Sequence, residues 1–167
     1  MKNTIYSIVL ILFSTLIGCT SSEPNPSALV GKHTFELLQK METISQEEFN
    51  THFLTLTELR EFAKDTTIKN TFRNAVTNVS KETHNKRLQQ SYEMIKESGK
   101  RYNIDWNVIT FREYPYEIKD ESGIAFQNGY VAFDFNDKKF VAKIVSIHYK
   151  NEQRLFNLSN IEPVRKQ

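Results

Sequence analysis

The stretch IAFQNGYVAFDFNDKKFVAKIVSIHY, residues 124–149, decides the fold of this chain. Its first part, about Ile124 to Phe135, is apolar at every second position from Val131 onward, which predicts a strand with one buried face. Asn136-Asp137 then predict a turn, and the segment Phe140 to Tyr149 is almost unbroken in residues that favour strands. Because the connection is so short, we expect the two strands to pair antiparallel.

Strand signals continue on both sides of this stretch. Upstream, Trp106 opens a run of β-branched and aromatic residues that predicts a strand over about 108–118, with a bulge where the apolar parity slips and Pro115 at an edge or bulged position. Downstream, a turn over 150–153 leads to a strand over about 154–161. These connections leave no room for crossover helices, so the sequence predicts a four-stranded antiparallel meander.

Helical periodicity occupies the N-terminal half of the chain. Apolar steps of three and four residues predict a helix over 29–42. The spacing recurs from Phe72 to Val79 and from Leu88 to Ile95, as one long helix or as two with Ser80 capping the second. Gly99 is expected just past the end of this segment, because glycine is favoured in the left-handed conformation that ends many helices.

Two capping boxes lie between these helices. Ser45 pairs with Glu48, and Thr55 pairs with Glu58, each beside apolar residues that can form a hydrophobic staple. They predict two short helices, over 46–53 and 56–64. Helices followed by a meander define an α+β fold, in which we expect the N-terminal helices to pack on one face of a curved four-stranded antiparallel sheet.

The N-terminus has the pattern of an export signal. Lys2 precedes an uncharged run, Ile5 to Ile17, which as a helix covers about 20 Å at ~1.5 Å per residue and is too short for ~30 Å of hydrocarbon. The run ends in Leu16-Ile17-Gly18-Cys19, which resembles the lipobox of bacterial lipoproteins, and Cys19 is the only cysteine of the chain. The resemblance implies cleavage before Cys19 and attachment of acyl chains such as palmitate to it. The alternative is a small buried cysteine in a short hydrophobic anchor.

These signals divide the chain into three parts. We predict a lipoprotein signal peptide over 1–18, a lipidated tether over 19–27 and a single α+β domain over 28–167. Two or more acyl chains make membrane attachment stable without a second membrane element. The expected location is therefore the bacterial cell envelope, with the lipoprotein anchored in a membrane and facing the periplasm or the cell surface.

Composition and motifs exclude several kinds of chemistry. The formal net charge is only +2, and the basic residues between Lys81 and Arg101 alternate with acidic ones as on a solvated helix face, so we expect no nucleic-acid partner. No two of the four histidines lie at helical spacing and fall on one predicted element, so we expect no metal. Nucleophile-elbow, zinc-protease and phosphate-loop motifs are absent from the sequence, which predicts no catalytic residue and no cofactor.

Three segments carry a resemblance to a known group of proteins: E-S-G-K-R-Y-N-I-D-W from residue 97, W-N-V-I-T-F-R-E-Y-P-Y-E-I from 106, and K-F-V-A-K-I-V-S-I from 139. Over about 29–161 the chain resembles uncharacterised Bacteroidetes-type bacterial lipoproteins with a nuclear transport factor 2-like or cystatin-like domain. The resemblance implies a cone between helices and sheet. Candidate pocket-lining residues there are Tyr92, Trp106, Tyr114 and Phe133.

The expected function is that of a membrane-anchored, non-enzymatic binding or interaction module of the bacterial envelope. Its expected partners are the membrane, through acylated Cys19, and an envelope protein or glycan. One alternative is a small enzyme of the isomerase or dehydratase type, which in this fold uses residues such as Asp134 or His148 in the cone. Asp134 also fits a solvent-facing carboxylate. The other alternative is an inert structural lipoprotein.

Overall fold

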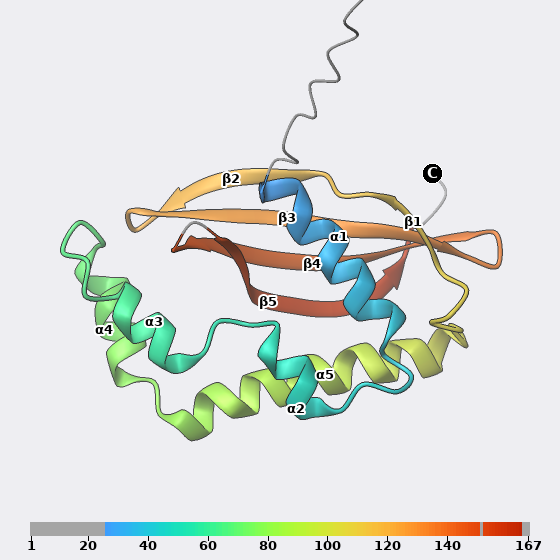
Figure 1. Cartoon of the computed structure of the whole chain (residues 1–167), viewed down its shortest axis with the longest axis horizontal. Helices are drawn as coiled ribbons and strands as arrows, with labels where there is room; N and C mark the ends of the chain where they lie inside the picture. Colours follow the sequence, from blue (N-terminus) through green and yellow to red (C-terminus); the bar gives the residue numbers. More distant parts are fainter. Residues whose placement is uncertain (1–25, 151, 165–167) are drawn as a thin grey trace, which may run out of the picture.

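The computed structural model describes residues 26–150 and 152–164. Over this part of the chain, five helices precede an antiparallel sheet of five strands, so the α+β prediction is confirmed. Figure 1 shows α1 (Pro26–Gln39) crossing the sheet and α5 (Lys81–Tyr102) running beside the edge strand β5 (Glu152–Pro163). Of the smaller helices, α3 (Leu56–Phe62) and α4 (Asn70–Asn78) lie near one end of the sheet, whereas α2 (Gln46–Thr51) lies beside α5 near the middle.

The sheet differs from the predicted four-stranded meander in one respect. The first predicted strand is divided at residues 114–115 into β1 (Thr110–Glu113) and β2 (Tyr116–Glu121), which both pair with β3 (Ile124–Phe135). The division has a physical cause, because Pro115 has no backbone N–H to donate to a ladder. The sheet continues from β3 through β4 (Lys138–Tyr149) to β5, so the expected meander order is confirmed.

Tight turns set the register of the sheet. Ser122 and Gly123 have φ of 63° and 79°, and Asn136 and Asp137 have φ of 46° and 58°, so both two-residue turns use left-handed backbone. Turns of this hand match the twist of paired strands. The alternation on β3 is preserved as a result, since β3 pairs with β4 without a register break.

The predicted helices are confirmed with shifted ends. The apolar stripe of α1 is buried from Val30 to Leu38, and the helix begins at Pro26, where a proline fits because the first N–H has no helical partner. The region after residue 69 forms two helices, and the Ser80 side chain accepts a hydrogen bond from the backbone N–H of Thr83. Thr55 and Glu58 form a complete capping box with both reciprocal hydrogen bonds. At α2, the Ser45 side chain accepts a hydrogen bond from the backbone N–H of Glu48.

The predicted end of α5 at Gly99 is wrong. The helix continues to Tyr102, and Asn103, with φ of 49°, takes the left-handed position that ends it. Gly99 is small for a different reason: a Cβ there would lie 2.5 Å from Cζ2 of Trp106. The glycine therefore admits the indole ring against the helix.

The expectation that all helices pack on one face of the sheet is also wrong. Adjacent residues of a strand point to opposite faces, and on β3 the two parities belong to two separate clusters. Val131 and Phe133 pack with α1 and α5 in the larger cluster, whereas Ile124 and Phe126 pack with residues of α3, α4 and β5 in the smaller one. The α3–α4 pair covers the second face at the β2–β3 end, where Lys69 N–H donates to Ser122 O over 2.8 Å.

Candidate functional site

The four residues predicted to line a pocket belong to the larger cluster. Trp106 and Phe133 are 3% and 0% exposed, and the half-buried Tyr92 and Tyr114 pack against the same cluster. Three of the four have a partner in a ring contact or a hydrogen bond. Phe133 stacks on Phe140, the Tyr92 hydroxyl donates to Ile44 O over 3.0 Å, and Gln127 donates to the Tyr114 hydroxyl over 3.2 Å. None of the four lines the apolar pocket of about 640 Å³ on the other face of the sheet.

Burial affects the ionisation of Tyr114. Removal from solvent raises the pKa of Tyr114 to about 12, although hydrogen bonds with Gln127 and Ser146 oppose the change. A phenol with such a pKa stays protonated at neutral pH and acts here as a hydrogen-bonding group.

The polar strand residues considered for catalysis lie outside this core. Asp134 occupies the opposite parity of β3 from Phe133 and forms an ion pair with Arg112 across the strands. His148 is exposed on β4. The solvent-facing interpretation of Asp134 therefore agrees with its position.

The predicted lipid-attachment residue Cys19, the predicted signal segment 1–18 and most of the predicted tether lie outside the described residues. Within the described ranges, no helix has both the length and the apolar character that crossing a bilayer requires. The same ranges contain no group of three histidine, cysteine or acidic side chains placed to hold a metal ion.

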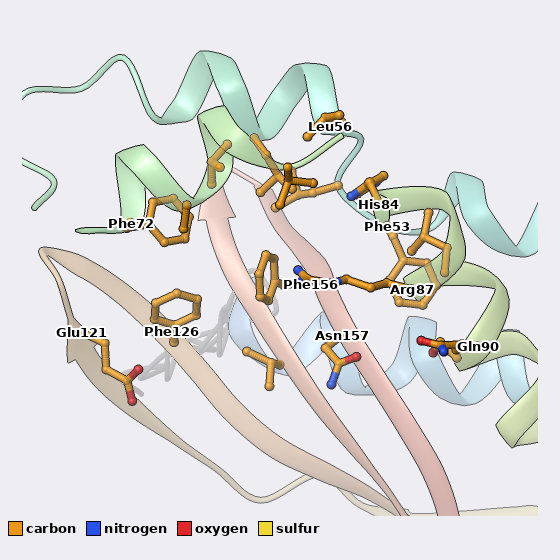
Figure 2. A pocket seen from close by; sticks show the side chains of 18 of the residues that line it. Phe53, Leu56, Phe72, His84, Arg87, Gln90, Glu121, Phe126, Phe156 and Asn157 are labelled. Atoms are coloured by element: carbon orange, nitrogen blue, oxygen red, sulfur yellow. The ribbon is translucent and has the colours of Figure 1, made fainter. Parts of the chain in front are cut away.

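A pocket lies on the second face of the sheet, beneath α3, α4 and the N-terminal half of α5 (Figure 2). Its volume is about 640 Å³, and thirteen of its twenty lining residues are apolar. Pockets that hold small molecules have volumes of roughly 300–1,000 Å³ and similar linings. The dimensions therefore suit a small organic ligand.

The floor of the pocket comes from three strands. Phe126 and Asn128 project from β3, and Val145 projects from the same face of β4. On β5, Asn157 pairs with Val145 but Leu155 pairs with Ser146, so Phe156 is an extra residue in a β-bulge. Bulges redirect side chains, and this one places Phe156 against Phe126, with ring centroids 5.9 Å apart.

The helices supply the walls. The α2–α3 connection and α3 contribute Phe53, Leu54, Leu56 and Leu59, and α4 contributes Phe72, Ala75 and Val76. The rings of Phe72 and Phe126 pack edge to face with their centroids 6.3 Å apart, so α4 contacts β3 at the pocket. The amphipathic pattern of α4 is what gives it an apolar side toward the sheet.

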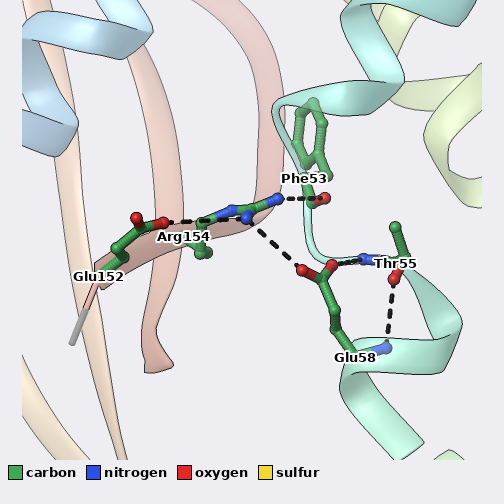
Figure 3. Close-up of polar contacts among 5 residues, drawn as sticks. All are labelled: Phe53, Thr55, Glu58, Glu152 and Arg154. Carbon is green, nitrogen blue, oxygen red and sulfur yellow. Dashed lines mark hydrogen bonds and ion pairs between the residues drawn. The ribbon is translucent and has the colours of Figure 1, made fainter. Parts of the chain in front are cut away.

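A polar cluster attaches the α2–α3 wall to the sheet (Figure 3). Arg154 of β5 donates to Phe53 O over 3.3 Å and lies 3.5 Å from the carboxylate of Glu58. That carboxylate also accepts from Thr55 N–H over 2.8 Å. Burial favours the neutral acid, but the hydrogen bonds from Thr55 and the charge of Arg154 outweigh it and hold the pKa of Glu58 below its ordinary value.

The polar groups of the pocket are few and unevenly placed. Arg87 extends from α5 into the pocket, and Glu121 lies at the opposite end beside the β2–β3 hairpin (Figure 2). Among the described residues, Arg87 forms no ion pair and no hydrogen bond. The Nε2 atom of His84, one turn earlier on the helix, is buried and likewise has no hydrogen-bond partner among them. Burial, together with the charge of Arg87, lowers the pKa of His84.

Sequence reasoning missed this site because its apolar residues look the same as core residues. The spacing of Phe72 and Val76 predicts one helical stripe, but helix spacing does not indicate whether the stripe meets a packed layer or a cavity. The one available signal was Arg87, a charged residue on the same side of its helix as Leu88 and Ser91. Alone it resembles an ordinary solvated charge.

Comparison with known proteins gave no match to a family model, to a curated protein or to a solved structure.

Proposed function

We propose that this protein is a membrane-anchored lipoprotein of the bacterial envelope that binds a small amphipathic molecule in the pocket between α3, α4, α5 and the sheet. The anchor part of the proposal rests on the lipobox-like residues ending in Cys19. The binding part rests on one observation, the mostly apolar pocket of about 640 Å³ with a few polar groups.

Energetics support ligand binding at this place. Apolar surface facing water is unfavourable by about 25 cal/mol per Å², and a ligand that covers it recovers this free energy. Phe72, Phe126 and Phe156 face the pocket while remaining only partly buried. A hydrocarbon body would complete their burial, and the polar groups would orient its other end.

Two features keep the pocket open instead of letting it collapse. The Arg154 cluster fixes the α2–α3 wall, and the hydrogen bond from Lys69 to Ser122 fixes the α3–α4 connection to the hairpin. Pre-formed walls reduce the ordering cost of binding. A binding module thus needs no large conformational change here.

The test uses diphenylhexatriene, a neutral apolar fluorophore whose emission rises in an apolar site. The protein is the full chain carrying Cys19→Ser, so that no acyl group of its own competes. We expect saturable binding at one site. Ala75→Trp, which inserts an indole at the α4 wall, should weaken binding at least tenfold, whereas Asn74→Trp on the adjacent exposed position should not. Absence of saturable binding, or equal binding by both tryptophan variants and the parent, would contradict the proposal.

The anchor is tested separately by fractionation. In the native host, the parent protein should be recovered in the detergent-soluble membrane fraction with an acylated N-terminal cysteine. Cys19→Ser should leave an uncleaved or mis-sorted precursor. Recovery of mature Cys19→Ser protein in that fraction at the parental level would refute the anchor without affecting the pocket.

A further inference from the structure

We infer that the ligand of this pocket is an acyl chain ending in a single negative charge, a carboxylate, and that Arg87 is the residue that binds this charge. The inference rests on the proposed function, since it names the ligand class of the same site.

The first step is the unpaired charge of Arg87. Its guanidinium extends into the pocket from α5 and has no carboxylate partner among the described residues. Three basic residues of the sheet differ from it in this respect. Arg154, Arg112 and Lys139 each form an ion pair with a neighbouring acidic side chain. Arg87 is therefore available to a ligand, and guanidinium groups match carboxylates with two parallel hydrogen bonds.

The second step concerns the groups around Arg87. His84 precedes it by three residues and Gln90 follows it by three, so both lie close to it on the helix surface. Asn157 faces them from β5. The amides and the imidazole supply hydrogen bonds without adding charge, because the lowered pKa of His84 keeps its ring neutral at pH 7. This end of the pocket consequently offers one full positive charge.

The third step limits the ligand to a monoanion. Glu121 is the only acidic side chain that lines the pocket, and it lies at the end opposite Arg87 (Figure 2). A ligand with a second negative charge along its body would meet this carboxylate. Apart from Ser91 and Asn128, the remaining lining is apolar, and it includes Phe126, Phe156 and Leu88. An unbranched hydrocarbon chain with a negatively charged head at Arg87 pairs with the guanidinium and places no charge near Glu121.

The experiment compares ligands of equal chain length and different heads. Isothermal titration of the full Cys19→Ser chain uses dodecanoate, dodecanol, dodecyl phosphate and dodecyltrimethylammonium, each below the concentration at which it forms micelles. We expect dodecanoate to bind about tenfold more tightly than dodecanol, the size expected for one charge-assisted contact at an exposed site. Dodecyl phosphate should bind no more tightly than dodecanoate, and the cation should bind more weakly than either.

Variants then assign the preference to Arg87. Arg87→Gln should remove the preference for dodecanoate over dodecanol while leaving dodecanol affinity unchanged. Arg87→Lys should retain part of it. Lys86→Gln is the matched control, because it removes the same charge from the adjacent residue, which lies on another surface of α5. Thermal melts confirm that the exposed substitutions leave the fold intact.

The outcomes separate the two proposals. Equal binding of dodecanoate and dodecanol by the parent, an equal effect of Lys86→Gln and Arg87→Gln, or tightest binding of the cation would overturn the carboxylate inference while the pocket remains a binding site. Tighter binding of dodecyl phosphate would overturn the monoanion step. If none of the four binds, and diphenylhexatriene does not bind either, the proposed function itself fails.

Discussion

Replacing Gly99 with alanine tests how α5 packs on the core. A Cβ at this position would lie 2.5 Å from Cζ2 and 2.9 Å from Cε2 of Trp106, well inside the ~3.5–4.0 Å of an ordinary carbon contact. Trp106 is only 3% exposed and therefore has little room to move. Overpacking of this kind costs about 1–3 kcal/mol, while alanine gains about 1 kcal/mol of helix propensity over glycine.

The expected net effect is a loss of about 1 kcal/mol in the free energy of unfolding, because a steric cost of about 2 kcal/mol, the middle of that range, exceeds the gain in propensity. At roughly 3 °C per kcal/mol for a chain of this size, the melting temperature should fall by about 3 °C. Urea unfolding is followed by circular dichroism and by the fluorescence of Trp106, the only tryptophan, which reports directly on the contact. Asn85→Ala, at an exposed position of the same helix, should instead raise stability by a few tenths of a kcal/mol. A Gly99→Ala protein that is as stable as the parent, or more so, would show that the indole does not pack there.

Two further predictions concern the polar residues. Arg154→Met should lower the free energy of unfolding by about 1–2 kcal/mol, because it removes a half-buried ion pair with Glu58 and the hydrogen bond to Phe53 O. Arg112→Met breaks a more exposed ion pair and should cost less than about 1 kcal/mol. Equal losses in urea titrations would refute the distinction. Because the pKa of His84 is lowered in the folded protein, the unfolded state binds a proton at this residue more readily than the folded state does. The contribution of His84 to the free energy of unfolding is therefore fully present above pH 6.5, and it is lost as the pH falls through the lower pKa of the folded state. His84→Gln should therefore make the free energy of unfolding less dependent on pH below 6.5, and an unchanged pH dependence would show that the ring is not desolvated in the folded protein.

Much of the architecture could be predicted because local signals determine it. The two-residue turn at Asn136-Asp137 and the alternation that begins at Val131 lead directly to the central hairpin. Ser80 and Thr55 mark helix starts because their hydroxyls accept backbone N–H groups at the same short spacing in any protein. These predictions depend on residues within four positions of one another.

The sequence-based predictions fail where contacts between residues far apart in the chain determine the structure. Gly99 satisfies the local rule for a helix end, but its role is set by Trp106, and the left-handed position falls to Asn103. Likewise, the period of β3 shows that Ile124 and Phe133 face opposite ways, yet only the long-range position of α3 and α4 shows that both are buried. A pocket between such layers has no sequence pattern of its own.

The most direct test of the central claim is to locate bound dodecanoate by amide chemical shifts in the full Cys19→Ser chain. Binding in the pocket predicts saturable shifts at Phe72, Val76, Leu88 and Val145, and little change at Phe133 in the core on the other face of the sheet. Shifts centred on Phe133, or no saturable shifts at the four pocket residues, would contradict the account.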